Sequence, residues 1–313
     1  MTEFLNYFVA GIARGAIFAL IALSFVIIYR ATHVLNFAQG AIMGLGGYLV
    51  YLFSGPRVDD PNTPSWFIAR LPYWLSVLIA MAIAAGLGIL IELIVVRRFR
   101  GRPVFAAIMA TLGVNIVLTV AIEARWGSSP LPLDTPFGGK AVSLGLAGVS
   151  IRRVDLFTLL IAVGVAGAFF VFFKKTKVGT GMRAIAADQE AAMAQGISAN
   201  RLFAASWGIA AALATLAGIL LASGPDRAVS TAIPLAALIG FPAIVLGGID
   251  SVEGALAGGM LIGIVEEVAA GYEADFLSFA GIGFFALTPF LLMLIILLVR
   301  PTGFFGTKEV RRV

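Results

Sequence analysis

Residues 5–29 read LNYFVAGIARGAIFALIALSFVIIY, an apolar run of about 25 residues that carries one charge, at Arg14. At roughly 1.5 Å of rise per residue, a helix of this length crosses a hydrocarbon core of about 30 Å. The segment has neither the basic start nor the short apolar centre of a cleaved signal peptide. It therefore predicts a first membrane-spanning helix.

Similar apolar segments recur along the whole chain. The chain has 313 residues, of which 60% are hydrophobic and 12% are charged, and its mean hydropathy is +1.01. Further spans are expected at residues 36–53, 71–96, 104–126, 154–173, 201–223, 234–249, 252–271 and 283–299. The segment 234–249 is short for a crossing, so it either spans or is re-entrant. We therefore expect an all-α, polytopic helical membrane protein with eight or nine transmembrane helices in a single domain over residues 1–313.

The composition excludes several kinds of site. The chain has no cysteine and one histidine, so it offers neither a disulfide framework, a thiolate metal site nor a histidine cluster. Its net charge of +5 comes from basic residues at the ends of the apolar segments. That distribution is typical of contact with a lipid membrane and argues against nucleic acid as a partner.

The distribution of Lys and Arg predicts the orientation, because cytoplasmic loops retain basic residues. With the N-terminus outside and the C-terminus inside, the inner face collects about twice as many of them as the outer face. Residues 174–200 then form an inner loop and residues 127–153 an outer loop. The outer loop alternates on both sides of GLAG, residues 145–148, which predicts a small hairpin.

Glycines spaced by four residues predict close helix packing. Such pairs place small residues on one helix face and let two backbones approach each other. The pairs are Gly40 with Gly44, Gly254 with Gly258, and Gly259 with Gly263.

The inner loop contains a polar, alanine-rich stretch, AIAADQEAAMAQGIS, residues 184–198. Thr180 or Gly181 is expected to begin a short helix. Asp188 suits the N-cap of a second one, with Glu190 near its positive end and Gly196 just past its last turn. The stretch has no nucleophile, metal ligands or phosphate loop. It either lies on the lipid headgroups or transmits force to a partner that supplies the chemistry.

Five stretches carry a family resemblance, in this order along the chain. They are GAIFALIALSFVIIYRATHVLNFAQGAIMGLGGYL, RRFRGRPVFAAIMATLGVN, VGTGMRAIAADQEAAMAQGIS, FPAIVLGGIDSVEGALAGGMLIGIVE and LVRPTGFFG. Together they resemble the branched-chain amino acid permease family of ATP-binding-cassette (ABC) importers, in its LivH-like branch. EAAMAQG, residues 190–196, is similar to the EAAxxxG loop with which such permeases dock on their ATPases.

The resemblance implies a permease domain and a set of partners. These are a second, LivM-like permease, two cytoplasmic ATPase subunits that bind ATP and Mg, and a periplasmic substrate-binding protein. The chain itself would hold no cofactor and hydrolyse nothing, and it would lie in the bacterial inner membrane with residues 127–153 in the periplasm. Residues 174–200 would be the cytoplasmic coupling loop. Its ATPase-coupling residues would be Arg183, Asp188, Glu190, Ala191, Ala192 and Gly196.

Polar groups within the apolar segments are candidates for the translocation pathway, because each needs a partner or a cavity in lipid. Arg14 could meet a substrate carboxylate or pair with a glutamate, at position 123, 266 or 267. Asn36 and Gln39 flank a helix start, where Asn36 could instead be a plain cap. The full candidate set is Arg14, Asn36, Gln39, Thr111, Asn115, Pro242 and Glu266.

Two of these candidates carry further expectations. Thr111 and Asn115 share one helix face, where hydrogen bonding between helices is the alternative to lining the pathway. Pro242, with glycines on both sides, marks a broken or re-entrant element that we expect to line the gate.

The sequence predicts the permease subunit of an ABC importer, with an ion-coupled secondary transporter or a purely structural membrane subunit as alternatives. The substrate stays open among branched-chain or other small amino acids and related acids and amides. Family members often carry His and Glu where Gln39 and Ala41 stand here, which puts leucine, isoleucine and valine in question.

Overall fold

The computed structural model describes residues 2–55, 70–137, 141–143, 150–224, 227–273 and 283–306. These residues are predominantly helical, and the chain folds into two compact units. Unit 1 comprises Met1–Val26, Phe137–Gly164 and Leu238–Val313, and unit 2 comprises Ile27–Pro136 and Val165–Ala237. Three of the four boundaries between the units along the chain fall inside helices. Whether the chain acts as a single domain therefore stays a prediction.

Six helices in the described part of the chain are long and apolar enough to cross a membrane. They are α1 (Thr2–Thr32), α3 with the 3₁₀ turn η1 (Tyr73–Phe99), α4 (Val104–Trp126), α5 (Arg153–Lys175), α8 (Ala199–Ala222) and α10 (Val252–Gly271). The shorter apolar helices are α2 (Gln39–Ser54), α9 (Ala236–Gly247) after η2 (Ile233–Leu235), and α12 (Thr288–Val299) after η4 (Phe284–Leu287). The chain is thus a polytopic helical membrane protein, as its apolar segments predict.

The two segments at residues 36–53 and 234–249 are shorter as helices than the sequence suggests. α2 begins at Gln39, and α9 has 12 residues, which is about 18 Å of helix. Pro242 lies inside α9, where it removes one backbone donor. α9 alone does not reach across a core of about 30 Å.

Within unit 2, α8 is the central helix. In its most apolar stretch of 18 residues, 72% of the residues are buried. α2 packs against both α8 and η2. A Cβ on Gly40 or Gly44 would lie within 2.8 Å of Pro234, so this glycine pair is a contact face as predicted.

Within unit 1, the first part of α1 packs on α10 through glycines from both helices. A Cβ on Gly15 would lie 2.8 Å from the Cα of Met260, and Cβ atoms on Gly259 and Gly263 would collide with the α1 backbone. Gly254 and Gly258 bring α10 equally close to α9. The remaining predicted glycine pairs are therefore confirmed as close helix contacts.

The predicted hairpin is present. β2 (Ala141–Ser143) pairs antiparallel with β3 (Ser150–Arg152), with Val142 opposite Ile151. The first part of the same loop pairs elsewhere, because β1 (Leu131–Pro132) forms a two-stranded ladder with β4 (Ala228–Val229).

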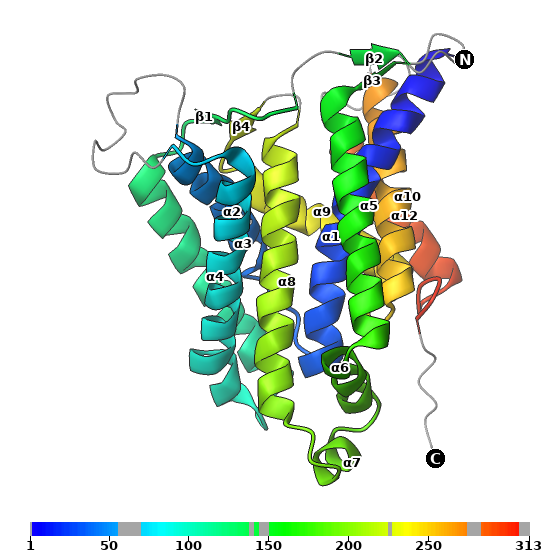
Figure 1. Cartoon of the computed structure of the whole chain (residues 1–313). Coiled ribbons are helices and arrows are strands. Elements are labelled where there is room, and N and C mark those ends of the chain that lie inside the picture. The colour runs from blue at the N-terminus through cyan, green and yellow to red at the C-terminus, as the bar shows by residue number, and fades with distance from the viewer. Residues whose placement is uncertain are drawn as a thin grey trace. The chain divides into compact units, whose positions relative to one another are not determined.

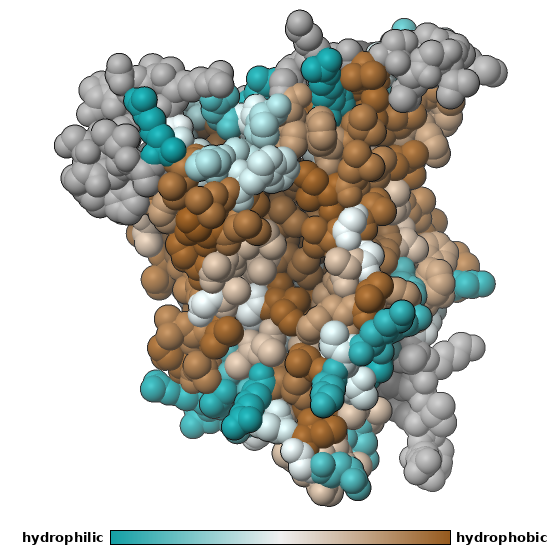
Figure 2. Space-filling model, in the orientation of Figure 1, coloured by the Kyte–Doolittle hydropathy of each residue, from teal (hydrophilic) through white to brown (hydrophobic). Residues whose placement is uncertain are grey.

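The outer surface of unit 2 is apolar along its helices and polar at its ends. In Figure 1, α6 (Lys177–Ala187) and α7 (Gln189–Ala194) lie at one end of this unit and β1 and β4 at the other. Figure 2 shows hydrophobic residues between these ends and hydrophilic ones gathered beside α6 and α7. Phe105 and Val117 of α4 are each 67% exposed, which suits contact with lipid.

Candidate functional site

The polar stretch folds into two short helices between two long ones. α6 begins directly after α5, because Thr176 is its N-cap and its hydroxyl accepts the N–H of Gly179 at 3.0 Å. The prediction that Thr180 or Gly181 begins this helix is wrong by about one turn. The cap sets the start, and capping is decided by side-chain geometry that the apolar pattern does not report.

α7 is bounded as its sequence predicts. Asp188 is its N-cap and accepts the N–H of Ala191 at 2.9 Å. Glu190 lies in its first turn, near the positive end of the helix dipole. Gly196 follows the last turn with φ +82°, a left-handed conformation that strains other residues. These local features fix where α7 begins and ends and stabilise its six residues as a helix.

A small apolar cluster attaches α7 to the rest of unit 2. Its buried members are Ala31, Ile185, Ala192, Ala199 and Phe203. Ala192 is thus the side chain that anchors α7, whereas Glu190, Ala191 and Gly196 are exposed. The helix therefore presents one face outward while the opposite face is packed.

Arg183 attaches α6 to the end of α5. Its guanidinium donates to the backbone oxygen of Phe173 and, at 3.1 Å, to the hydroxyl of Thr180, and it lies over the Phe173 ring. Arg183 is thus half-buried within the loop. Its position favours holding the two short helices in place over contacting a partner directly.

A buried glutamate in the last turn of α3 organises the same end of unit 2. Glu92 is fully buried and pairs with Arg97, at 2.9 Å, and with Arg100. Arg100 also bonds to Asn200 at the start of α8 and lies over the Phe203 ring. Burial lowers the pKa of the Arg100 guanidinium, and the Glu92 carboxylate acts against that shift. The run of four arginines at residues 97–102 was the available signal, but it does not indicate which of them pair with the glutamate.

Three predicted pathway residues form one buried network in unit 2. Asn36 donates to Gln39 at 2.8 Å, and Gln39 donates to the backbone oxygen of Ala210 in α8 at 3.0 Å. The Thr111 hydroxyl accepts the N–H of Phe37 at 3.2 Å. Asn36 also accepts the N–H of Ala38, so it closes a turn before α2 and is not the cap residue itself.

Asn115 stands apart from this network. It is half-buried one turn beyond Thr111 on α4. Whether these residues line the pathway stays a prediction. Their hydrogen bonds show that Asn36, Gln39 and Thr111 already connect α2, α4 and α8.

Arg14 and Glu266 meet in unit 1, together with Glu267. The Arg14 guanidinium lies 3.0 Å from an oxygen of each glutamate, and the side chain of Glu266 is 1% exposed. The second oxygen of Glu266 and the Nε of Arg14 are buried without a hydrogen-bond partner among the described residues. One guanidinium thus bridges two carboxylates, and the pairing that was the alternative to substrate contact is present.

Pro242 lies in α9, whose C-terminal carbonyls bond to the end of the described chain. The N–H groups of Phe304 and Phe305 donate to Leu246 and Gly247 at 2.8 Å and 3.0 Å. Local patterns in the sequence give the terminal RPTGFFG stretch no structural role. In the structure it satisfies helix-end carbonyls that would otherwise be unpaired.

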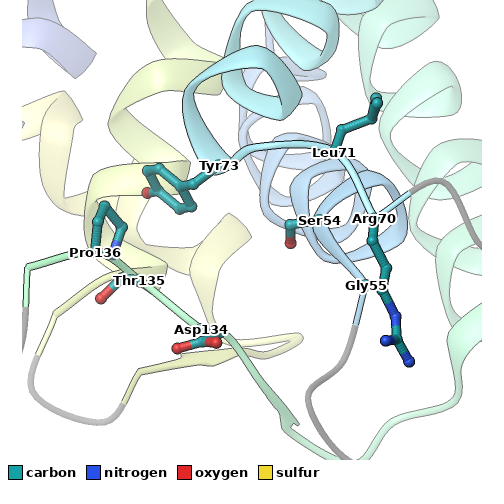
Figure 3. Close-up of a pocket in the computed structure, with 8 residues that line it drawn as sticks. All are labelled: Ser54, Gly55, Arg70, Leu71, Tyr73, Asp134, Thr135 and Pro136. Atoms are coloured by element: carbon teal, nitrogen blue, oxygen red, sulfur yellow. The ribbon is translucent and has the colours of Figure 1, made fainter.

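A cavity of about 380 Å³ opens at the end of unit 2 opposite α7. Figure 3 shows its walls: the end of α2, the segment before α3 and the segment after β1. Arg70 and Asp134 come from different walls. The Tyr73 hydroxyl lies 2.8 Å from Ser223 and is therefore occupied.

Comparison with known proteins gives a consistent result over nearly the whole chain. The family model described as "Branched-chain amino acid transport system / permease component" matches residues 7–300. The chain is 28% identical over 316 residues to the high-affinity branched-chain amino acid transport system permease protein LivH of Salmonella typhimurium, covering 99% of this chain and 98% of that one. It is 27% identical over 318 residues to the corresponding protein BraD of Pseudomonas aeruginosa, with the same coverage. No solved structure matches.

Proposed function

We propose a function for this chain from one premise: it belongs to the family of branched-chain amino acid transport system permease components. It is accordingly the transmembrane permease subunit of an ABC importer and not an enzyme in its own right. What it contacts, what it carries and how it is oriented are the subject of the proposal.

The proposal is that α6 and α7 form the coupling element that contacts an ATPase subunit. The observation that carries it is the construction of α7, which is capped by Asp188, anchored by Ala192 and exposed at Glu190 and Ala191. A short, fixed and outward-facing helix without chemistry of its own suits the transmission of force. Arg183 and Gly196 support it from either side, through the bonds to α5 and through the turn before α8.

In this proposal the complete importer contains three further kinds of subunit in the inner membrane of a bacterium or at its faces. They are a second, LivM-like permease, two cytoplasmic ATPases with ATP and Mg, and a periplasmic substrate-binding protein. The N-terminus would lie outside and the C-terminus inside. Closure of the ATPases on ATP would move α6 and α7, and the helix bundle would alternate its access.

We propose branched-chain or other small amino acids, or related small acids and amides, as the substrate class. The relatives are named for branched-chain amino acid transport, which supports branched-chain amino acids within this class. Gln39 is buried and bonded to Asn36 and to the backbone of α8, so any influence on selectivity would act through the position of α2.

The test is a pull-down of the chain from its native membrane in mild detergent, with partners identified by mass spectrometry. The variant Glu190→Arg changes the exposed first turn of α7. Glu123→Arg is the matched control, because Glu123 is also exposed but lies in the last turn of α4, far along the chain from α7. We expect the wild type and the control to retain two ATPases and a second permease, and Glu190→Arg to lose the ATPases.

Recovery of the chain without any ATPase, in the wild type as in the variants, would contradict the proposal. Uptake by the chain alone under a proton or sodium gradient would then favour the ion-coupled transporter.

A further inference from the structure

A second cavity, of about 250 Å³, lies in unit 2 at the end that carries α6 and α7. Its walls come from the end of α1, the corner between η1 and α4, and the starts of α7 and α8. The lining residues that carry the argument are His33, Arg100, Arg102, Val104, Gln189 and Phe203.

The charged groups of this cavity are all basic. Arg100 and Arg102 line it together with the one histidine, and no Asp or Glu is among the lining residues. The buried Glu92 nearby pairs with both Arg97 and Arg100, so it leaves one positive charge unbalanced at this corner. Arg102 adds another, because within the described residues its guanidinium contacts only the Phe99 ring, at 5.9 Å. The cavity therefore attracts an anion.

His33 adds a polar group to the lining of the same cavity. Its backbone has φ +53°, which is uncommon for a residue other than glycine. Its ring packs against Tyr29 at 5.7 Å between centroids and is exposed. An exposed imidazole that lines the same cavity as two arginines is a suitable donor to phosphate oxygens.

Most of the other lining residues are apolar, and they adjoin the exposed apolar side of α4. Val34, Val104, Ala107 and Phe203 line the cavity. Next to Val104, an exposed apolar strip begins at Phe105 and continues along one face of α4 through Met109 and Ile116. A ligand with an anionic head and an apolar tail matches both parts.

We propose that this cavity binds a phosphate group, carried by the headgroup of an anionic phospholipid or present in solution as inorganic phosphate. The apolar strip on α4 favours the lipid. Basic pockets between helices at a membrane face have the chemistry that recognises such headgroups. Gln189 starts α7, so a bound headgroup would touch the coupling element; this consequence, unlike the binding itself, depends on the proposed function.

Native mass spectrometry on the purified full chain in mild detergent tests the proposal. Phosphatidylglycerol is added in one sample and phosphatidylcholine with the same acyl chains in another. The variant Arg102→Gln removes a lining charge. Arg98→Gln is the matched control, because Arg98 belongs to the same basic run and is exposed but does not line the cavity.

We expect phosphatidylglycerol to stay bound to the wild type and to Arg98→Gln, and to bind Arg102→Gln roughly fivefold more weakly. Phosphatidylcholine should bind weakly to all three. Equal weakening in the two variants would show diffuse attraction to basic residues and would overturn the proposal, as would equal retention of both lipids by the wild type.

A second arm separates the two sources of phosphate. The melting temperature of each protein is measured with and without inorganic phosphate, at constant ionic strength. Stabilisation of the wild type and Arg98→Gln but not of Arg102→Gln, without lipid retention, would support a site for soluble phosphate. Absence of both responses would overturn the proposal. Because no ATPase is present, either failure would leave the coupling proposal untouched.

Discussion

At Gly88, the missing side chain lets α3 approach α8. A Cβ there would lie 2.7 Å from the Cβ of Ala211 and would also collide with the backbone oxygen of Trp207. Gly86 is on the same helix, and a Cβ added to it would meet nothing within 4 Å. These two glycines look alike in the sequence and differ entirely in their surroundings.

We expect Gly88→Ala to destabilise the protein by about 1–3 kcal/mol, because the helices must separate or strain. Gly86→Ala should be neutral or slightly stabilising, since alanine favours the helix over glycine. The melting temperature of each purified variant in mild detergent checks this. Equal melting temperatures of the two variants would contradict the close packing of α3 against α8 at Gly88.

Arg14 bridges two glutamates, and the structure predicts that it stabilises the buried Glu266 as its ion-pair partner. Arg14→Met should cost toward the low end of about 3–5 kcal/mol, because it leaves the buried Glu266 without a partner while Arg14 itself is 37% exposed. The double variant Arg14→Met/Glu266→Gln should recover part of this loss. Both are measured as melting temperatures, alongside uptake by the assembled importer.

The result also tests the pathway prediction for Arg14 and Glu266. A normal melting temperature with reduced uptake in Arg14→Met would indicate contact with the substrate and would argue against a purely structural ion pair.

At the scale of elements, α7 has six residues and depends on its N-cap. Asp188→Ala removes the acceptor of the Ala191 N–H and should cost about 1 kcal/mol of local stability. Asp188→Asn keeps a good cap and is the control. We expect Asp188→Ala to lower substrate-stimulated ATP hydrolysis by the reconstituted importer and Asp188→Asn to leave it near the wild-type rate. Full stimulation in Asp188→Ala would show that α7 does not need to be a formed helix.

The terminal RPTGFFG stretch packs against α9 at the turn formed by Gly303. Gly303 has φ +74°, and a Cβ there would lie 2.5 Å from the oxygen of Val245. Gly283 also has a positive φ, +89°, but a Cβ there would meet nothing within 4 Å. Both alanine variants should suffer backbone strain of about 1 kcal/mol, and Gly303→Ala should lose clearly more because of the collision.

The comparison of their melting temperatures separates strain from collision. Equal losses would indicate that the terminal stretch does not pack on α9 in the protein.

At the scale of the whole molecule, the chain contains no cysteine, which allows labelling of single introduced thiols. Met193→Cys places a thiol on the exposed part of α7, and Ser128→Cys places one in the loop after α4. With the proposed orientation, a membrane-impermeant maleimide should label Ser128→Cys in intact spheroplasts, and Met193→Cys only after the membrane is opened. The reverse pattern would invert the topology and contradict the coupling proposal.

Features that depend on short stretches of chain could be predicted from the residue order. The apolar segments set the membrane helices, Asp188 and Gly196 bounded α7, the alternation around residues 145–148 formed the hairpin, and the spaced glycines marked helix contacts. These features follow from hydration, capping and turn geometry, which act within a few residues. They also sufficed for the family, because its motifs are local.

Which distant groups meet became known only from the folded chain. Arg14 and Glu267 are 253 residues apart and Gln39 and Ala210 are 171 apart, and Glu92 pairs with Arg97 and Arg100 within a run of four arginines. The same holds for the terminal stretch on α9 and for the basic cavity behind α7. Such pairings are set by how helices pack, and packing depends on the shape of whole helix faces and not on the order of residues along one of them.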